Sequence, residues 1–333
     1  MEHFKALLVN KTESGTELNF QTLTLEDLPK GDVTIKVHYS SINYKDGLAT
    51  IPNGGVVRNY PMVPGIDLAG TVIESENPNF KEGDEVFVTG YEIGVNHFGG
   101  YSEVARVPAE WIVPLPQGLS LKEAMAIGTA GFTAALSIHR LEENGVNKAS
   151  GPVLVTGATG GVGSNAVAML KKLGYTVTAS SRKQSEHEFL KQIGADEIIS
   201  PDELMNPNHK ALLKQKWQAA VDPVAGEYLS VILASIQYGG SVAVSGLTAG
   251  NTFTSTVFPF ILRGINLLGI DSVYCPMEIR TQIWNRLAKE MKPNQLMNTI
   301  TTEVSFEQIP GVLKKILAGE LKGRYIVDFD KQN

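Results

Sequence analysis

The sequence predicts an α/β protein in which a doubly wound parallel sheet is combined with a β-rich N-terminal domain. Three observations indicate this. Short apolar strands alternate with helices from Pro152 onward, the region before about residue 120 is rich in glycine, proline and short strands, and the 333 residues exceed what one core usually covers. Apolar strands that alternate with helices are typical of a parallel sheet covered on both faces.

The N-terminal part is expected to hold β-prone runs at 34–37, 70–74 and 85–88. Ser120 and Glu123 then form a capping-box pattern, which predicts a helix start, and a second helix is expected over 131–140. Helices are predicted at 162–172 and 186–193, ended by Gly174 and Gly194. The predicted strands of the sheet are 153–155, 175–179, 197–199, 219–221, 241–245 and 267–270.

After about residue 272 we expect two more helices and a last strand at 324–329, which return to the first domain. The predicted domains are therefore 1–122 together with 272–333, and 123–271. Because a doubly wound sheet binds its ligand at the carboxyl ends of its strands, the candidate site is expected there.

Composition excludes several classes of function. The net charge of −6 gives no basic excess for nucleic acid, and the single cysteine, Cys275, excludes an internal disulfide or a multi-cysteine metal site. The N-terminus does not resemble a signal peptide, and no stretch approaches the roughly 20 apolar residues of a membrane span. We therefore expect a soluble, cytoplasmic protein with no nucleic acid or membrane partner.

A glycine-rich turn, residues 157–163, follows the strand 153–155 and opens the helix 162–172. It holds four glycines in seven residues. Glycine allows backbone N–H groups to approach a pyrophosphate, and the helix N-terminus adds partial positive charge. In this strand–turn–helix context the pattern predicts dinucleotide binding, and the alternative is a plain strand-to-helix turn. The expected contacts are Thr159, Gly160, Gly161 and Val162.

The end of the next strand indicates NADPH rather than NADH. Folds that select NAD usually place an acidic residue about 20 residues after the first glycines, to hold the ribose 2′-hydroxyl. Here the strand continues into Ser180, Ser181, Arg182 and Lys183, with no acid. Arg182 can bind a 2′-phosphate through two hydrogen bonds, and no carboxylate repels that phosphate. Ser180, Ser181 and Arg182 are the expected contacts, and the alternative is that the cations are only solvated.

Several motifs spread over nearly the whole chain carry a family resemblance. They are 40–46 (SSINYKD), 64–70 (PGIDLAG), 99–103 (GGYSE), 127–134 (IGTAGFTA), the glycine turn and 323–325 (GRY). With these motifs the chain resembles the zinc-free branch of the medium-chain dehydrogenase/reductase superfamily. The resemblance is closest to the YhdH/YhfP-type quinone oxidoreductases, whose relatives include acrylyl-CoA reductases. It implies a GroES-like N-terminal domain, a Rossmann domain, a cleft between them, and a homodimer often formed through the edge of the Rossmann sheet.

The chain departs from the zinc alcohol dehydrogenases at their metal ligands. Those enzymes carry a ligand cysteine near the position of Tyr44 and a ligand histidine where Ile66-Asp67 follow Gly65 here. His97 could line the cleft, although a hydrogen-bonded loop histidine is the alternative. With one cysteine and scattered histidines, no zinc site is predicted.

Without a metal to polarise a carbonyl, conjugated acceptors are favoured over simple ketones. Hydride then adds to the β-carbon, and charge spreads onto an enolate or quinol oxygen that the enzyme must stabilise. The resemblance places Asn43 and Tyr44 beside the nicotinamide, so both are candidate catalytic residues. Tyr44 is also a candidate cofactor contact, and the alternative is that it only shapes the pocket. For Asp46 and Asp67 the two candidate roles are proton relay and the capping of turns. The resemblance adds cofactor contacts at Thr129, Leu247, Ile270, Ser272 and Arg324.

The leading functional hypothesis is an NADPH-dependent reductase of acrylyl-CoA-type enoyl thioesters. A quinone or enone reductase is the alternative among enzymes, and a low-turnover NADPH-binding sensor is the alternative of another class. A CoA substrate requires a basic entrance for its phosphates. Lys45, Arg58 and Arg106 are candidates, but the sequence does not show that they converge.

Overall fold

The computed structural model describes residues 3–205 and 210–331 and divides the chain into two compact units. Unit 1 is Met1–Thr129, Val273–Gln282 and Thr301–Asn333, and unit 2 is Ala130–Ser272 and Ile283–Ile300. The chain passes between the units inside helices α2 (Leu121–Glu143) and α7 (Met277–Leu287). Residues 283–300, which the sequence prediction assigned to the first domain, belong to unit 2, because α7 runs on past Gln282 into that unit and the chain returns to unit 1 only with β14.

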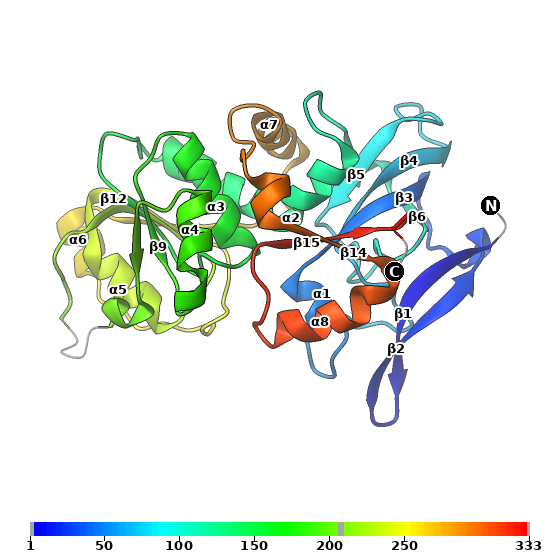
Figure 1. Cartoon of the computed structure of the whole chain (residues 1–333), viewed down its shortest axis with the longest axis horizontal. Helices are drawn as coiled ribbons and strands as arrows, with labels where there is room; N and C mark the ends of the chain where they lie inside the picture. Colours follow the sequence, from blue (N-terminus) through cyan, green and yellow to red (C-terminus); the bar gives the residue numbers. More distant parts are fainter. Residues whose placement is uncertain (1–2, 206–209, 332–333) are drawn as a thin grey trace. The chain divides into compact units, whose positions relative to one another are not determined.

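Unit 2 contains a six-stranded sheet with the order β10-β9-β8-β11-β12-β13, in which every neighbouring pair is parallel. Counted along the chain from β8, this is the 3-2-1-4-5-6 order of a Rossmann fold, so the predicted fold is confirmed. The strands are β8 (Val153–Val155), β9 (Val177–Ser180), β10 (Glu197–Ile199), β11 (Trp217–Asp222), β12 (Ile236–Val244) and β13 (Asn266–Gly269). The helices around them are α3 (Gly161–Lys172), α4 (His187–Ile193), α5 (Glu227–Ser235) and α6 (Phe258–Arg263) (Figure 1).

Unit 1 is the predicted GroES-like, β-rich part of the chain. Its main sheet has the order β14-β15-β3-β4-β5-β7, with β6 paired to β3, and all pairs except β14–β15 are antiparallel. A separate hairpin joins β1 (Phe4–Thr12) to β2 (Gly15–Leu23). The other strands are β3 (Val33–Ile42), β4 (Asp67–Ser75), β5 (Glu85–Thr89), β6 (Val104–Val107), β7 (Val113–Pro114), β14 (Thr301–Ser305) and β15 (Arg324–Asp328), and the helices are α1 (Tyr44–Ala49) and α8 (Ile309–Leu317).

Helix α2 replaces the two helices that the sequence predicted between 121 and 140. Its start is the expected capping box, because Ser120 N donates to Glu123 Oε2 at 3.0 Å and Glu123 N donates to Ser120 Oγ at 3.2 Å. The helix is interrupted at Gly128, whose φ of 52° and ψ of −163° are not helical. The strands β1, β2, β6, β7 and β14 lie outside the runs that the sequence predicted.

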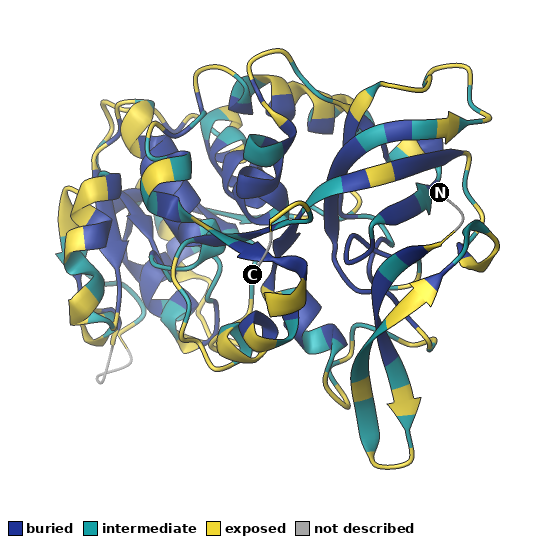
Figure 2. Ribbon diagram, turned by 45° about the vertical axis from the view of Figure 1, so that its right-hand side comes forward, coloured by how far each residue is buried: buried dark blue, intermediate teal, exposed yellow. Residues whose placement is uncertain are grey.

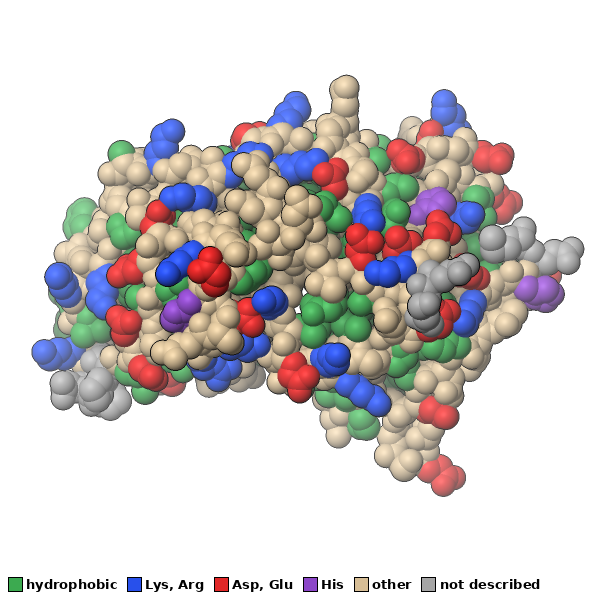
Figure 3. Space-filling model, viewed as in Figure 1, with side chains coloured by type: hydrophobic (Ala, Val, Ile, Leu, Met, Phe, Trp, Pro, Cys, Tyr) green, Lys and Arg blue, Asp and Glu red, His purple; other side chains and the backbone are tan. Residues whose placement is uncertain are grey.

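The central strands of the two main sheets are mostly buried, and many exposed positions lie on loops and helices (Figure 2). The core of unit 2 is built around Leu154, Trp217, Ala220, Ile232 and Val242. On the face drawn in Figure 3, cationic and anionic side chains are interspersed, with no large area of one sign. Among the described residues, no helix has both the length and the apolar character needed to cross a membrane.

Candidate functional site

The glycine-rich turn joins β8 to α3 in unit 2. Gly157 has a φ of 53°, which favours glycine, and Gly160 N donates to Gly157 O at 2.9 Å. A Cβ on Gly163 would lie 2.3 Å from Gly157 O, so the helix starts in direct backbone contact with the turn. No side chain caps α3 at Gly160. The first N–H groups of α3 therefore lack a side-chain cap, and the turn fits a bound phosphate group.

The four predicted contacts in this turn, Thr159, Gly160, Gly161 and Val162, are all partly exposed. Their neighbours Ala158 and Gly163 are buried. The surface of the turn is thus formed by the residues that the sequence assigned to the cofactor.

The end of β9 lies directly beside the turn, because Ala158 N donates to Ser180 O at 3.2 Å. Ser180 and Ser181 are buried, and Ser181 Oγ accepts from Lys183 N at 3.1 Å. Arg182 is exposed and forms no ion pair or side-chain hydrogen bond with any residue of 3–205 or 210–331. Its guanidinium is therefore available to an anion at this edge of the sheet.

The remaining cofactor candidates of unit 2 follow the last two strands of the sheet. Leu247 follows β12 and is 64% exposed, and Ile270 follows β13, where its N donates to Val244 O at 3.0 Å. Ser272 Oγ accepts from Thr133 Oγ1 at 2.8 Å. Because all strands are parallel, these residues lie at the same sheet edge as the glycine turn.

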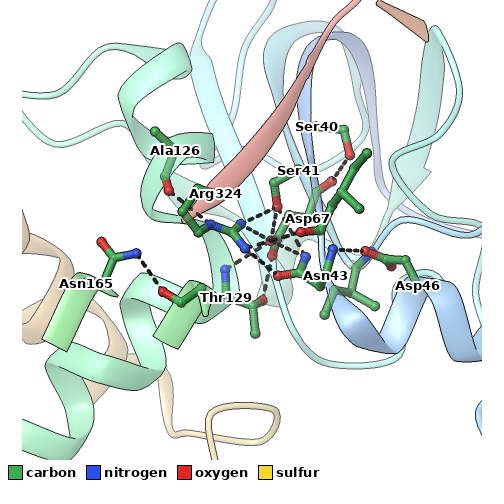
Figure 4. A network of polar contacts seen from close by, with 12 residues as sticks. Ser40, Ser41, Asn43, Asp46, Asp67, Ala126, Thr129, Asn165 and Arg324 are labelled. Carbon is green, nitrogen blue, oxygen red and sulfur yellow. Dashed lines mark hydrogen bonds and ion pairs between the residues drawn. The ribbon is translucent and has the colours of Figure 1, made fainter. Parts of the chain in front are cut away.

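The polar centre of unit 1 is the buried carboxylate of Asp67, at the start of β4 (Figure 4). Its Oδ2 accepts from Ser41 Oγ at 2.5 Å, Asn43 Nδ2 at 2.9 Å and Thr129 N at 3.0 Å. Its Oδ1 accepts from Thr129 Oγ1 at 2.5 Å. Asp67 thus connects the segment before α1 with the interruption of α2.

Arg324, at the start of β15, completes this network and is only 2% exposed. Its Nε donates to Ala126 O at 3.1 Å, Nη1 to Asn43 Oδ1 at 3.0 Å, and Nη2 to Ser41 Oγ at 2.8 Å. Burial lowers the pKa of Arg324, while the charge of Asp67 opposes that shift. The resemblance implied a cofactor contact for this residue. Its guanidinium is buried and bound to protein groups, which supports a structural role, and the cofactor contact stays a prediction.

Asn43 and Thr129, two further predicted site residues, also form hydrogen bonds within this network. The Asn43 amide donates to Ser41 and Asp67 and accepts from Arg324, and both Thr129 donors are directed at Asp67. Asn43 also precedes α1 as its N-cap residue. These hydrogen bonds support a role in positioning α1, and the catalytic role of Asn43 stays a prediction.

Asp46 lies next to this network and is fully buried. Its Oδ2 accepts from Asn43 N at 2.8 Å and its Oδ1 from Ile66 N at 2.9 Å, which makes it a cap of α1. Burial, and then the charge of Asp67, raise the pKa of Asp46 to about 7. Of the two roles considered from the sequence, the structure supports the capping role.

Tyr44 is the accessible polar residue beside these groups. It is the first residue of α1, its side chain is 46% exposed, and its hydroxyl has no hydrogen-bond partner among the described residues. The network immediately before it fixes where its backbone begins. Its phenol is therefore free to interact with a ligand.

Two further expectations from the sequence concern the role of His97 and a zinc site in unit 1. His97 Nε2 lies 2.7 Å from Arg106 O, and its ring packs edge-on against Trp111, so it is a hydrogen-bonded loop histidine. Burial lowers the pKa of His97. Within the described part of the chain, no group of three or more His, Cys, Asp or Glu side chains could hold a metal ion.

Sequence reasoning missed Ser41 and the pairing of Asp67 with Arg324. The sequence did carry one signal for this pair. Asp67 stands within the otherwise apolar run 66–69, and a charge that is buried requires a partner. Gly128 was also missed. Its position within a predicted helical region suggested an interruption, but only the structure shows which groups approach it.

Comparison with known proteins defines the class. The alcohol dehydrogenase GroES-like domain matches residues 29–117, and the zinc-binding dehydrogenase family matches residues 161–289. Together with the two-unit fold, these matches define a medium-chain dehydrogenase/reductase.

Individual relatives narrow this class. The chain is 57% identical to a Bacillus subtilis protein provisionally named quinone oxidoreductase YhfP, over 97% of this chain and 98% of the relative. It is 46% identical to the acrylyl-CoA reductase AcuI of Ruegeria pomeroyi, over 98% and 99% of the two chains. The chain therefore belongs to the YhfP/AcuI family of oxidoreductases.

Solved structures agree with this assignment. Bacillus subtilis yhfP with NAD bound superimposes with a TM-score of 0.97 at 56% identity, covering 99% of this chain and 100% of that one. The yhdH oxidoreductase of Salmonella enterica in complex with NADP superimposes with a TM-score of 0.95 at 45% identity, covering 98% and 100%.

Proposed function

We propose that this protein is an NADPH-dependent reductase that adds hydride to the β-carbon of an acrylyl-CoA-type thioester. The observation that carries the proposal is the exposed Arg182, with no acidic residue beside it, at the end of β9 next to the glycine turn. The acceptor class is supported by the near full-length similarity to an acrylyl-CoA reductase.

The choice of NADPH needs a test of its own, because one similar structure carries NAD and another carries NADP. Arg182→Ala removes a charge-assisted contact, so kcat/KM for NADPH should fall by about 10- to 100-fold while that for NADH stays the same. Lys191→Ala, at an exposed lysine of α4, is the control. Equal losses with both cofactors would contradict a 2′-phosphate contact.

NADPH, when bound, supplies the hydride. The residues 159–162 and the start of α3 would hold its pyrophosphate, and Ser180, Ser181 and Arg182 its 2′-phosphate. Thr129, Leu247, Ile270 and Ser272 stay proposed contacts of its nicotinamide half. In unit 1, Asp67 and Arg324 hold the segment before α1, and Tyr44 presents its phenol at the start of that helix.

Tyr44 is the proposed catalytic residue. Hydride addition to an α,β-unsaturated thioester places negative charge on the thioester oxygen, and a phenol O–H can donate a hydrogen bond to that oxygen. Once the enolate has formed, a proton is added at the α-carbon. The exposed hydroxyl of Tyr44, which has no hydrogen-bond partner among residues 3–205 and 210–331, is suited to the first of these tasks.

A quinone reductase is the second candidate, favoured by the name of the 57% identical relative. The two are separated by following reduced nicotinamide absorbance with acrylyl-CoA, crotonyl-CoA, quinones and enones. The proposal predicts the highest kcat/KM with acrylyl-CoA. A highest value with a quinone supports the alternative, and tight NADPH binding without turnover of any acceptor supports a sensor.

We also propose a homodimer formed through the open edge of the Rossmann sheet. β13 is the last strand of that sheet, and α6 beside it exposes Phe258, Ile261 and Leu262. A dimer would remove this apolar surface from water. Light scattering should show a dimer for the wild type and a monomer for Ile261→Glu, and a monomeric wild type would contradict the assignment.

A further inference from the structure

Two cations in unit 1 form no ion pair within the part of the chain that the structure describes. Lys45 lies in the first turn of α1, directly after Tyr44, and Arg58 lies exposed in the loop that follows this helix. Neither forms an ion pair or side-chain hydrogen bond with a residue in the described ranges. Arg106, the third cation considered from the sequence, differs because its Nε donates to Thr34 Oγ1 at 3.3 Å.

Hydrogen bonds link α1 to the segment of Glu92, because Ile66 N donates to Asp46 Oδ1 at 2.9 Å and Gly90 N donates to Ile66 O at 3.2 Å. A Cβ on Gly54 would lie 1.9 Å from Leu48 O, so the loop and the helix touch through their backbones. Both cations also act on one carboxylate, Glu92. The pKa of Glu92 is lowered by hydrogen bonds from Tyr274 and Asn96, and further by the charges of Lys45 and Arg58. Both cations therefore act on the charge of Glu92, and the hydrogen bonds through Ile66 place the helix of Lys45 next to the segment of that carboxylate.

Glu92 also lines a recess of about 400 Å³ whose wall includes three aromatic side chains. The recess is formed by Tyr91, Glu92, Glu110, Trp111, Tyr274, Cys275, Pro276 and Met277. The rings of Tyr91 and Trp111 stack with centroids 5.7 Å apart and planes 6° apart. The Tyr274 side chain is 60% exposed, and its hydroxyl donates to Glu92.

The buried side chain of Arg280 packs against one aromatic ring of this recess. The buried Arg280 guanidinium lies 4.6 Å from the centre of the Tyr91 ring. Its Nη1 donates to Thr89 O at 2.8 Å and Thr89 Oγ1 at 3.0 Å, which fixes it to the end of β5. Because Trp111 and Arg280 already contact the Tyr91 ring, the exposed ring of Tyr274 is the one that a flat ligand would meet.

We propose that Lys45 and Arg58 bind the phosphates of the CoA thioester and that the adjoining recess takes its adenine. This inference rests on the proposed function, because it names the part of the site that would recognise the CoA portion of the substrate. Lysine and arginine are the usual phosphate ligands, and aromatic side chains stack on purines.

The carboxylates fit this arrangement. Glu92 and Glu110 repel phosphates from the recess itself, and each can accept a hydrogen bond from the amino group of adenine. An organic cation is the other ligand that aromatic rings and carboxylates attract. The two cations near Glu92 disfavour that ligand, and the experiment includes it.

The test measures binding by calorimetry to protein already saturated with NADPH, so that CoA cannot enter the dinucleotide site. The ligands are CoA, pantetheine and choline. The variant is Lys45→Ala/Arg58→Ala, and the control is Lys11→Ala/Lys81→Ala, which removes the same charge at two exposed lysines of unit 1. A further variant, Tyr274→Leu, tests the recess.

The double variant should raise the Kd of CoA by at least about tenfold and leave that of pantetheine unchanged, because pantetheine has no phosphate. The control should not change either value, and Tyr274→Leu should weaken CoA alone. Equal weakening by both double variants, unchanged CoA binding, or binding of choline instead of CoA would overturn the inference.

The same titration separates this inference from the proposed function. If the wild type binds CoA through Lys45 and Arg58 but does not reduce acrylyl-CoA, the site stands and the reaction is wrong. If acrylyl-CoA is reduced and the double variant matches the wild type in both KM and Kd, the reaction stands and this site is wrong.

Discussion

Arg324 Nη2 lies 3.8 Å from Asp67 Oδ2, and both side chains are buried inside unit 1. This pair joins β15 and β4 to the segment before α1, through Ser41 and Asn43. It is a buried ion pair in which each partner has further hydrogen bonds. Removing one charge would leave the other buried without compensation.

Asp67→Asn should therefore lower the free energy of unfolding by about 3–5 kcal/mol. Glu82→Gln, at an exposed carboxylate of the same unit, should change it by less than about 0.5 kcal/mol. Urea unfolding followed by fluorescence measures both. If Asp67→Asn is as stable as the control, the pair does not hold this part of unit 1.

The sequence predicts the Rossmann part of the fold well, because its strands are continuous apolar runs and its glycine turn has a local signature. The polar centre of unit 1 is different. Arg324 and Asp67 are far apart in the chain and meet only through the pairing of β15 with β3 and of β3 with β4. No local pattern encodes such a contact, so the sequence assigned Arg324 to a ligand rather than to Asp67.

Gly128 is tightly confined by the same network. A Cβ there would lie 2.6 Å from Arg324 Nη2 and 2.7 Å from Asp67 Oδ2, and its φ is 52°. Gly128→Ala should therefore cost at least about 3 kcal/mol, since steric overlap adds to backbone strain. Gly55→Ala is the matched control, because Gly55 has a φ of 73° and a Cβ added to it would have no atom within 4 Å. Its expected cost is only about 1–2 kcal/mol, and equal costs would contradict the confinement.

Asp46 should make stability depend on pH. Its pKa is raised to about 7 in the folded protein by burial, from about 3.9 in the unfolded chain. The folded state then holds a proton that the unfolded state has released, so stability falls as pH rises from about 4 to 7 and the loss is complete above that range. The full effect is about 4 kcal/mol.

The measurement is urea unfolding of the wild type and Asp46→Asn between about pH 5 and 8.5, which spans the upper part of this range. The variant should be less stable at every pH, because an amide offers one acceptor where Asn43 N and Ile66 N need two. The difference should nevertheless shrink as pH rises toward the folded-state pKa of about 7. A difference that is constant over this range would show that Asp46 keeps its ordinary pKa.

Tyr44→Phe separates a chemical role of the phenol from a role in shaping the pocket. If the hydroxyl stabilises the developing oxygen charge, kcat with acrylyl-CoA should fall by about 100-fold while the KM for NADPH stays the same. Tyr60→Phe, in the loop after α1, is the control. An unchanged kcat would mean that the Tyr44 ring only forms part of the pocket wall.

Hydride should go to the β-carbon of a conjugated thioester. Mass spectrometry and NMR of the product made from acrylyl-CoA and NADPH deuterated at the transferred position measure this directly. We expect propionyl-CoA with deuterium at C3, and, with unlabelled NADPH in D₂O, deuterium at C2. Deuterium from NADPH at C2, or NADPH oxidation by quinones without any propionyl-CoA, would contradict it.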